Sequence, residues 1–292
     1  MTINEAKDIY REYSYKSVLS DDEEFMLIEA LEFLIEETKE TRWMVELGGY
    51  YYEQKNFDLA LKYYEMADTY GDSWAPEGLG YIWYYGRTGE RDYDKAFKYY
   101  SKAAKNGSLK SRVKVADMYK NGYGVEKDFD KYKEIIEDAY DLVKDEEFPG
   151  APKSEVFTRL ARIRKDEGNT EEAVRLYLEA KWFQADRIRW NPFFGDLNIM
   201  KWLIEDLYTM TDPDMTDLDL YDLYHVLKNP CKIAFMYEGE EYIVESMEEE
   251  GKIIIKFGDK WFEDIDDFFK KAVIDNERLP VLYYSLYAFR VI

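Results

Sequence analysis

The chain has one histidine, His225, and one cysteine, Cys231, so few kinds of nucleophilic or metal chemistry are open to it. Ser-His or Cys-His catalysis needs a histidine base beside the nucleophile, and His225 lies in "LYDLYHVLKNP" with no glycine-elbow motif nearby. Together the two residues supply at most two of the four ligands of a structural zinc site. We therefore predict no catalytic, cofactor-binding or metal-binding residues. His225 is predicted to be a structural or surface residue, and Cys231 a buried small residue at the start of a strand.

Two other motifs resemble ion or phosphate sites but lack required residues. A calcium loop beginning at Asp212 in "DPDMTDLDLYD" would need Gly at its sixth position and Glu at its twelfth, where Asp217 and Leu223 stand. This run is predicted to be a loop followed by acidic residues at a helix N-terminus. Gly122 and Gly124 in "NGYGVEKD" lack the preceding strand and the Gly-Lys-Ser/Thr ending of a phosphate loop.

The charge of the chain argues against nucleic acid as a partner. The 62 acidic and 40 basic residues give a formal charge of -22, which repels phosphate backbones. No run approaches the roughly 18 apolar residues needed to span a membrane, and the first residues lack the apolar segment of a signal peptide. We expect a cytoplasmic protein whose partner is a protein or peptide, with no nucleic acid and no membrane.

Self-comparison shows a repeat of 36 residues. The stretch "KYYEMADTYGD" (62–72) recurs as "KYYSKAAKNGS" (98–108). Upstream, "LGGYYYEQKNFDLA" (47–60) aligns with "LGYIWYYGRTGERDYDKA" (79–96), whose central loop is four residues longer. Four copies, the last one weaker, begin at residues 47, 79, 115 and 160. Periods of this length are typical of solenoid proteins.

Each copy has the spacing of two helices joined by a turn. In the first copy, Leu47, Gly48 and Tyr51 share one face of the first helix. Ala60, Tyr64 and Ala67 share one face of the second helix. The small residues let the helix backbones approach, and the tyrosines fill the adjoining space. Gly71 and Gly107 stand where a helix C-terminus needs a residue tolerant of the left-handed conformation. One hairpin cannot bury its apolar face alone, so neighbouring hairpins are predicted to stack.

The pattern resembles two related repeat families over about residues 42–185. Leu47-Gly48-x-x-Tyr51 followed by Ala60-x-x-x-Tyr64 is similar to a tetratricopeptide repeat. "GYGVEKDFDK" and "KAFKYYSKAAKNG" resemble the Sel-like repeat, which has a longer loop within the hairpin. The third copy departs from the pattern at its Tyr pair, which is replaced by isoleucines, and the fourth has Ala161 in place of Gly.

The flanks of the repeats lack the motif. "SDDEEFMLIEALEFLIEETKE" begins with a capping-box arrangement of Ser20 and Glu23 and predicts an amphipathic helix. "LNIMKWLIEDLYTM" (197–210) and "TDLDLYDLYHVLK" (216–228) predict a helical pair after a turn at "RWNPFFGD". Beyond residue 229, "CKIAFMY", "EYIVES" and "KIIIKF" predict a three-stranded meander and "FEDIDDFFKKAVI" a helix, while "LPVLYYSLYAFRVI" is ambiguous. So small a module buries little surface alone, and we expect it to dock on the last helices.

The resemblance implies a ligand-binding concave face formed by the first helix of each hairpin. By register, sixteen positions would face this groove: Arg42, Val45, Gly49, Tyr52, Trp74, Glu77, Tyr81, Tyr84, Lys110, Val113, Asp117, Lys120, Glu155, Thr158, Arg162 and Lys165. Nine of them are candidate protein-binding residues: Arg42, Tyr52, Trp74, Tyr81, Tyr84, Lys110, Lys120, Arg162 and Lys165. Aromatic and basic residues suit a peptide with apolar side chains and carboxylates. In the alternative, Tyr81 and Tyr84 pack against the neighbouring hairpin and the charges are solvated.

The sequence thus predicts a mainly α fold, an α-solenoid of helical hairpins with a small C-terminal α+β module. The expected domains are residues 1–229, with capping helices at both ends, and residues 230–292. The expected function is that of a non-catalytic adaptor or scaffold that binds a protein segment in the groove. Two alternatives are a regulatory or immunity-type protein that neutralises a basic partner through its acidic surface, and an enzyme with a site at the junction of the C-terminal module.

Overall fold

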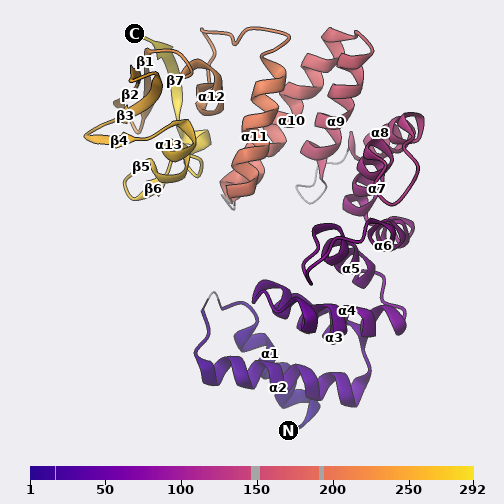
Figure 1. Cartoon of the computed structure of the whole chain (residues 1–292). Helices are drawn as coiled ribbons and strands as arrows, with labels where there is room; N and C mark the ends of the chain where they lie inside the picture. Colours follow the sequence, from indigo (N-terminus) through magenta and orange to yellow (C-terminus); the bar gives the residue numbers. More distant parts are fainter. Residues whose placement is uncertain (17, 146–151, 191–193) are drawn as a thin grey trace. The chain divides into compact units, whose positions relative to one another are not determined.

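The structure is a computed structural model, and it describes residues 1–16, 18–145, 152–190 and 194–292 (Figure 1). The chain forms two compact units, unit 1 (Met1–Ala139) and unit 2 (Tyr140–Ile292). The fold is a mainly α-helical repeat fold with an antiparallel sheet near the C-terminus, which confirms the predicted fold class. Among the described residues, no helix combines the length and the apolar composition needed to cross a bilayer.

Unit 1 consists of helices that pair in chain order. Consecutive helices from α1 to α7 contact one another. The helices are α1 (Ile3–Tyr13), α2 (Asp21–Thr38), α3 (Thr41–Glu53), α4 (Phe57–Thr69), α5 (Ala75–Tyr85), α6 (Tyr93–Lys105), α7 (Leu109–Asn121) and α8 (Phe129–Val143), and the division between the units falls within α8.

Capping residues set the ends of these helices. The Ser20 hydroxyl accepts a hydrogen bond from the backbone N–H of Glu23, and the Glu23 carboxylate accepts one from the N–H of Ser20, which confirms the predicted capping box. Asp92 caps α6 in a similar way, accepting from the N–H of Lys95 at 2.9 Å. Gly71 and Gly107 have φ values of +85° and +99°. As predicted, both adopt the left-handed conformation directly after a second helix.

Glycines opposite tyrosine rings allow neighbouring helices of unit 1 to pack closely. The ring of Tyr64 on α4 lies between Gly48 of α3 and Gly78 of α5, where an added Cβ would lie 2.9 and 2.8 Å from ring carbons. The next copy repeats the contact, since a Cβ on Gly80 would lie 2.6 Å from the ring of Tyr100. The duplicated Tyr and Gly residues are therefore packing elements, as the spacing predicted.

The later copies keep the contact positions with other residues. Ala116 and Ile136 occupy them in the third copy, and Ala161 and Tyr177 in the fourth, and all four are fully buried. Alanine takes the glycine position in both copies. In the third, isoleucine also replaces the tyrosine, so the departures noted in the sequence leave the hairpin architecture intact.

Unit 2 continues with helices before the sheet. They are α9 (Lys153–Asp166), α10 (Thr170–Trp190) and α11 (Phe194–Leu207), then the 3₁₀ turn η1 (Leu220–Asp222) and α12 (Leu223–Val226). The prediction of a long helix over 216–228 is wrong. The Asp219 side chain accepts from the N–H groups of Tyr221 and Asp222 and starts the turn only at residue 220, and Pro230 prevents continuation beyond Asn229. Residues 191–193 of the predicted turn lie outside the described residues.

The C-terminal module is a five-stranded antiparallel sheet with order β4-β3-β2-β1-β7. Its elements are β1 (Cys231–Tyr237), β2 (Glu240–Glu249), β3 (Lys252–Phe257), β4 (Lys260–Phe262), α13 (Ile265–Lys271), β5 (Val273–Ile274), β6 (Glu277–Arg278), η2 (Tyr283–Ser285) and β7 (Tyr287–Val291). The predicted meander β1-β2-β3 is confirmed, and β4 and β7 extend it. The ambiguous last stretch forms η2 and β7, and β7 pairs with β1.

The module docks on the preceding helices, as predicted. The ring of Phe269 on α13 stacks on Tyr224 of α12 at 4.0 Å and on Tyr221 at 5.8 Å between ring centroids. Lys201 of α11 also forms an ion pair with Asp266 at 2.7 Å. Since the sheet shares one compact unit with α9 to α12, the domain boundary at residues 229 and 230 stays a prediction.

Candidate protein-binding surface

The first helices α3 and α5 bring several tyrosines together on unit 1. Tyr81 contacts Tyr52 of the preceding copy at 6.4 Å and Tyr85 of its own helix at 5.0 Å between ring centroids. Tyr84 contacts Tyr85 at 5.0 Å. The spacing i, i+4 places Tyr81 and Tyr85 on one helical face. We call Tyr52, Tyr81, Tyr84 and Tyr85, with the two cations described next, the aromatic surface.

Two cations lie over these rings. The guanidinium carbon of Arg87 is 5.8 Å from the ring centroid of Tyr52 and 5.2 Å from that of Tyr85, and its Nε donates to the Tyr52 hydroxyl at 3.0 Å. Lys114 of α7 lies 5.2 Å from the Tyr84 centroid and donates to the Tyr85 hydroxyl at 3.1 Å. Residues from three repeats therefore form one continuous surface of aromatic rings and positive charge.

The rings of this surface differ in their burial. Tyr81 is 38% exposed, whereas Tyr100, which contacts both Tyr81 and Tyr84, is fully buried beneath them. Tyr84 also packs on Tyr93 at the start of α6, in its own hairpin, and on Tyr123, which follows α7 in the neighbouring hairpin. The packing alternative thus holds in part for Tyr84. Burial, more than neighbouring charge, raises the pKa of Tyr81 and of Tyr84 to about 12, so both hydroxyls stay neutral at physiological pH.

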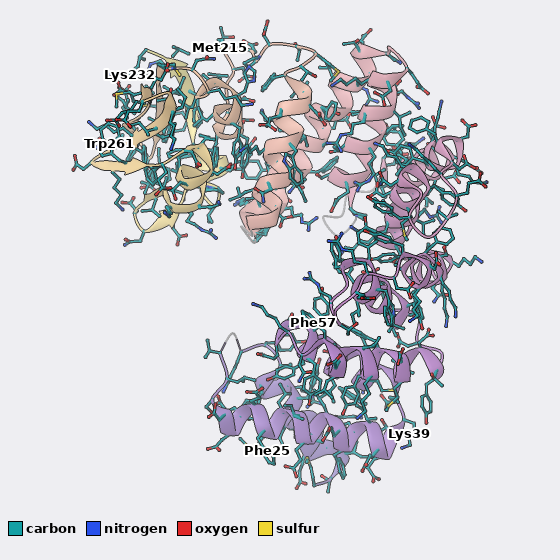
Figure 2. The ribbon with its side chains drawn as sticks, in the orientation of Figure 1. Phe25, Lys39, Phe57, Met215, Lys232 and Trp261 are labelled. Atoms are coloured by element: carbon teal, nitrogen blue, oxygen red, sulfur yellow. The ribbon has the colours of Figure 1, made fainter. Side chains whose placement is uncertain are left out.

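A hollow of about 470 Å³ adjoins the aromatic surface at Arg87. It lies between the turn joining α3 to α4 and the turn after α5. Phe57, which is labelled in Figure 2, begins α4 and lines the hollow. Lys55 and Arg87 supply two positive charges to its wall and Asp58 one negative charge. The hollow therefore favours an anionic group beside the aromatic rings.

The other predicted positions of unit 1 have different surroundings. Arg42 lies over the ring of Trp43 at 3.9 Å and pairs with Glu40 at 2.7 Å. Trp74 is 65% exposed at the start of α5, and Lys110 is exposed at the start of α7. Lys120 lies 5.1 Å from the ring centroid of Tyr132 on α8. Of the candidates in unit 1, Tyr52, Tyr81 and Tyr84 belong to the aromatic surface, where Tyr85 contacts both Tyr81 and Tyr84.

The two candidates in unit 2 contact α11 and the residues directly after it. Arg162 of α9 pairs with Asp206 of α11, with Nη2 at 2.6 Å from the carboxylate. Lys165 donates to the Thr209 hydroxyl at 2.8 Å. Both side chains thus contribute to contacts within unit 2, and their role in binding stays a prediction.

Three residues of the aromatic surface were not among the predicted positions. Tyr85 lies four residues after Tyr81, so the helical period could have found it. Arg87 belongs to the longer loop of the second copy, and the register of the first helices ends before it. Lys114 lies between two of the chosen groove positions of α7. Its contact with Tyr85 depends on how α7 packs beside α5, which the sequence alone does not specify.

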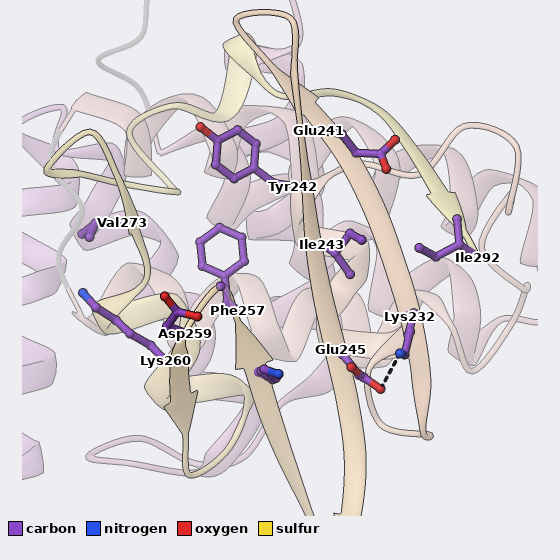
Figure 3. Close-up of a pocket in the computed structure, with 12 residues that line it drawn as sticks. Lys232, Glu241, Tyr242, Ile243, Glu245, Phe257, Asp259, Lys260, Val273 and Ile292 are labelled. Atoms are coloured by element: carbon purple, nitrogen blue, oxygen red, sulfur yellow. Dashed lines mark ion pairs between the residues drawn. The ribbon is translucent and has the colours of Figure 1, made fainter.

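A second hollow, of about 730 Å³, opens at a corner of the sheet (Figure 3). It lies where β2 extends beyond the last residue of β3, and Tyr242 and Phe257 form its apolar part. Three lysines and three carboxylates line it: Lys232, Lys256, Lys260, Glu241, Glu245 and Asp259. Lys232 and Glu245 pair at 3.0 Å. With opposite charges balanced, the hollow favours no class of charged ligand.

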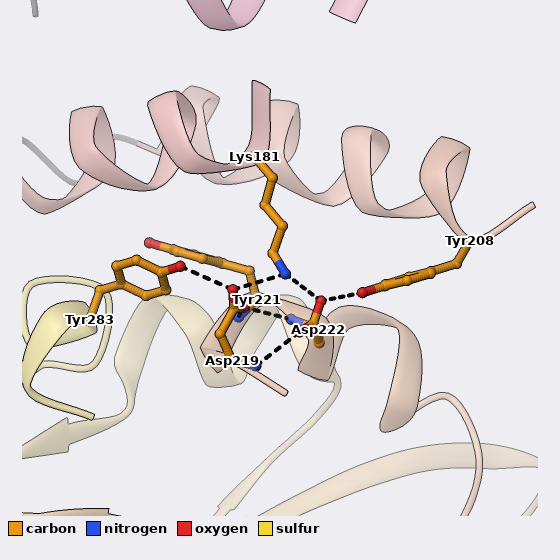
Figure 4. Close-up of polar contacts among 6 residues, drawn as sticks. All are labelled: Lys181, Tyr208, Asp219, Tyr221, Asp222 and Tyr283. Carbon is orange, nitrogen blue, oxygen red and sulfur yellow. Dashed lines mark hydrogen bonds and ion pairs between the residues drawn. The ribbon is translucent and has the colours of Figure 1, made fainter. Parts of the chain in front are cut away.

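The aspartate run contributes to a buried polar network in unit 2 (Figure 4). Lys181 of α10 pairs with Asp222 at 2.5 Å and with Asp219 at 2.8 Å, and the Lys181 and Asp222 side chains are only 9% and 4% exposed. The hydroxyls of Tyr208 and Tyr283 donate to Asp222 and Asp219 at 2.5 and 3.0 Å. Every charged group of this network is therefore held by the others, as in a structural contact between helices and module.

His225 and Cys231 have structural contacts. The His225 ring packs on Tyr208 at 4.8 Å, and burial lowers its pKa from the ordinary value. Cys231 begins β1 as predicted, but it is only partly buried, so the prediction of a buried residue is wrong. Its N–H donates to the Ser246 hydroxyl at 3.0 Å. In the described part of the chain, His, Cys, Asp and Glu side chains form no group of three that could hold a metal ion.

One repeat family and two solved structures are similar to parts of this chain. Its residues 44–67, 78–108 and 110–131 match the Sel1 repeat family. A Sel1 repeat protein from Oxalobacter formigenes superposes with a TM-score of 0.49 and 19% identity, over 73% of this chain and 79% of that one. A protective antigen of uropathogenic Escherichia coli strains, which displays an SLR fold, superposes with a TM-score of 0.48 and 15% identity, over 72% of this chain and 49% of that one.

No curated protein matches the chain. The three matched segments coincide with hairpins α3/α4 and α5/α6 and with α7 together with the start of α8, and the fourth copy lies outside them. Sel1 repeat proteins are typically non-catalytic adaptors. Three segments of the chain, within residues 44–131, therefore match Sel1 repeats, and this repeat family generally serves as a scaffold for protein–protein interaction.

Proposed function

We propose that the chain is an adaptor whose aromatic surface binds an extended segment of a partner protein. The observation that carries this proposal is the continuity of Tyr52, Tyr81, Tyr85, Arg87 and Lys114 across three repeats. Tyrosine and arginine are enriched among the residues that carry most of the binding energy at protein interfaces, and tyrosine buries a large area at a low cost in conformational entropy.

The charges define the chemistry of the preferred segment. Arg87 and Lys114 place positive charge over the rings, and the hollow beside Arg87 has two cations in its wall against one carboxylate. A segment that combines apolar or aromatic side chains with a carboxylate would fill both features. Carboxylates of the partner would lie near Arg87, and its apolar side chains on Tyr81, the most exposed ring of the four.

Selection from a random peptide library on the full chain tests the proposal. Peptides that bind are expected to share an apolar residue and a carboxylate, and Tyr81→Ala is expected to weaken their binding at least tenfold. Tyr70→Ala is the matched control, because Tyr70 is 55% exposed and lies at the end of α4, outside the aromatic surface. Peptides that bind the Tyr81→Ala variant as tightly as the native chain would show that the proposal is wrong.

The other positions predicted to face the groove belong to the same proposal. Trp74 and Lys110, both exposed at the starts of first helices, would extend the binding surface along α5 and α7. If they do, Trp74→Ala weakens the binding of the selected peptides, and the binding of longer peptides falls more than that of short ones.

A further inference from the structure

Charge is distributed unevenly within unit 1. Residues 1–70, which include α1 to α4, contain 17 acidic and 7 basic residues, whereas residues 71–139 contain 12 acidic and 13 basic residues. The aromatic surface with its two cations belongs largely to the second part. The first part has a net charge of -10, which attracts groups of the opposite sign.

A pocket of about 310 Å³ lies within this acidic part, formed by α1, α2, α3 and one side chain of α4. Its wall contains the rings of Tyr10, Tyr50 and Tyr64 and the carboxylates of Glu46 and Glu53. Gly49 leaves one side open, since a Cβ there would meet only the Tyr64 hydroxyl, at 3.6 Å. The volume is at the small end of the range for ligand pockets and suits one side chain.

In the part of the chain that the structure describes, the two carboxylates of the pocket have no positive partner. Within the described residues, no lysine or arginine forms an ion pair with Glu46 or Glu53, and both side chains are exposed. The two carboxylates affect the tyrosine hydroxyls of the pocket. Burial, and then the Glu46 carboxylate, raise the pKa of Tyr10 to about 12. Burial, then Tyr52, Glu53 and Glu46, raise the pKa of Tyr64 to about 12. The pocket therefore places the rings of Tyr10 and Tyr50 and the hydroxyl end of Tyr64 beside two carboxylates that pair with no described cation.

We propose that this pocket binds the guanidinium group of an arginine side chain from a partner protein. A planar cation stacks on tyrosine faces and donates paired hydrogen bonds to carboxylates, and the guanidinium does both. An ammonium would gain the charge interaction but not the stacking or the bidentate geometry. The pocket is separate from the aromatic surface, so this inference does not depend on the proposed function.

Titration of the full chain with N-acetyl-arginine amide tests the assignment. The methyl resonances of Leu27, Leu31 and Val45, which line the pocket, report binding by NMR. A saturable shift is expected with N-acetyl-arginine amide and none with N-acetyl-citrulline amide, which has the same shape without the charge. N-acetyl-lysine amide is expected to bind several-fold more weakly.

Two variants locate the site. Glu46→Gln with Glu53→Gln is expected to weaken arginine amide binding by about tenfold, because the charges are lost while the shape is kept. Glu36→Gln with Glu37→Gln is the matched control, which removes two exposed charges of α2 from the same acidic part outside the pocket wall. Gly49→Leu keeps both pocket charges and is expected to block the pocket.

Three outcomes would overturn the assignment. Equal shifts with the citrulline compound would remove the role of charge, and equal or tighter binding of the lysine compound would remove the preference for a guanidinium. Unchanged binding in both the Glu46/Glu53 and the Gly49 variants would place the cation elsewhere on the chain. Melting curves of each variant confirm that the fold is kept.

Discussion

The two units hold their elements together by different means. In unit 1, helices meet where a glycine of one faces a tyrosine ring of another, as at Gly80 and Tyr100. In unit 2, the helices and the sheet module meet at a network of buried charges around Lys181 and at stacked rings such as Tyr224 and Phe269. The first contact depends on the absence of a side chain, and the second on the presence of a specific charge.

This difference determines how each kind of contact tolerates amino-acid substitution. The Gly–Tyr contact recurs because each repeat meets its neighbour in the same way, and later copies fill the same positions with alanine and isoleucine. The network of Lys181, Asp219 and Asp222 has no counterpart in the repeat pattern. Removal of one charge leaves the others buried without compensation.

The largest expected effect is on the network of unit 2. Lys181→Met leaves Asp222 buried beside Asp219 without a cation, and we expect a loss of about 3–5 kcal/mol in the free energy of unfolding of unit 2. Adding Asp222→Asn to Lys181→Met neutralises that carboxylate and should recover about half of the loss. Urea denaturation with hydrogen exchange of α10 and the sheet measures both. A loss below about 1 kcal/mol would mean that the network contributes little.

A smaller effect is expected in unit 1. Gly80→Ala places a Cβ 2.6 Å from the ring of Tyr100, which is fully buried and has no room to move. We expect a loss of about 1–3 kcal/mol from overpacking, despite the better helix propensity of alanine. Gly49→Ala is the matched control in α3, since its Cβ meets only an atom at 3.6 Å, and it should be neutral or stabilising. Equal effects of the two substitutions on thermal unfolding would contradict the packing role of Gly80.

The smallest effect is a difference in pH dependence. Burial, and then the charge of Asp219, raises the pKa of Asp222 above its ordinary 3.8, so its contribution to stability is full below that pH and is lost as pH rises through the folded-state pKa. In unit 1, the ammonium of Lys16 and then the N–H of Ser20 lower the pKa of Glu23 from 4.5 to about 2. The contribution of Glu23 is therefore full above pH 4.5 and is lost as pH falls toward 2.

Melting temperatures at pH 3 and pH 6 separate the two cases. The difference between the native chain and Asp222→Asn should fall as pH rises, and the difference between the native chain and Glu23→Gln should grow. If both melting-temperature differences grew as pH rises, the pairing of Asp222 with Lys181 would outweigh its burial.

Much of the architecture could be predicted because repeats and caps are local or periodic. The repeated Ala, Tyr and Gly residues predicted the hairpins and their stacking, and the Ser20 capping box predicted the start of α2. The expected helix over 216–228 was wrong because the Asp219 cap starts a short 3₁₀ turn instead. The pairing of β7 with β1 joins segments more than fifty residues apart, and no local pattern specifies such a partner.

The aromatic surface also combines residues that could be predicted from the sequence with residues that could not. Tyr52, Tyr81 and Tyr84 were candidates because the resemblance to repeat families implied a groove along the first helices, and the helical register gave the matching positions. Arg87 and Lys114 were not, because a loop residue and a residue of the next first helix reach the rings only through the packing of three repeats.

The sequence by itself established a repeated helical hairpin, an acidic chain with one histidine and one cysteine, and a β-rich C-terminal module. The tertiary structure alone placed two cations over the tyrosine rings and buried Lys181 between two aspartates, and among the described residues it brought no cation to the carboxylates of the pocket at Gly49. The physical reason is distance along the chain. Periodicity and capping act within one or two helical turns, whereas contacts such as Lys114–Tyr85 and Lys181–Asp222 join residues 29 and 41 positions apart, and their meeting depends on how whole helices pack.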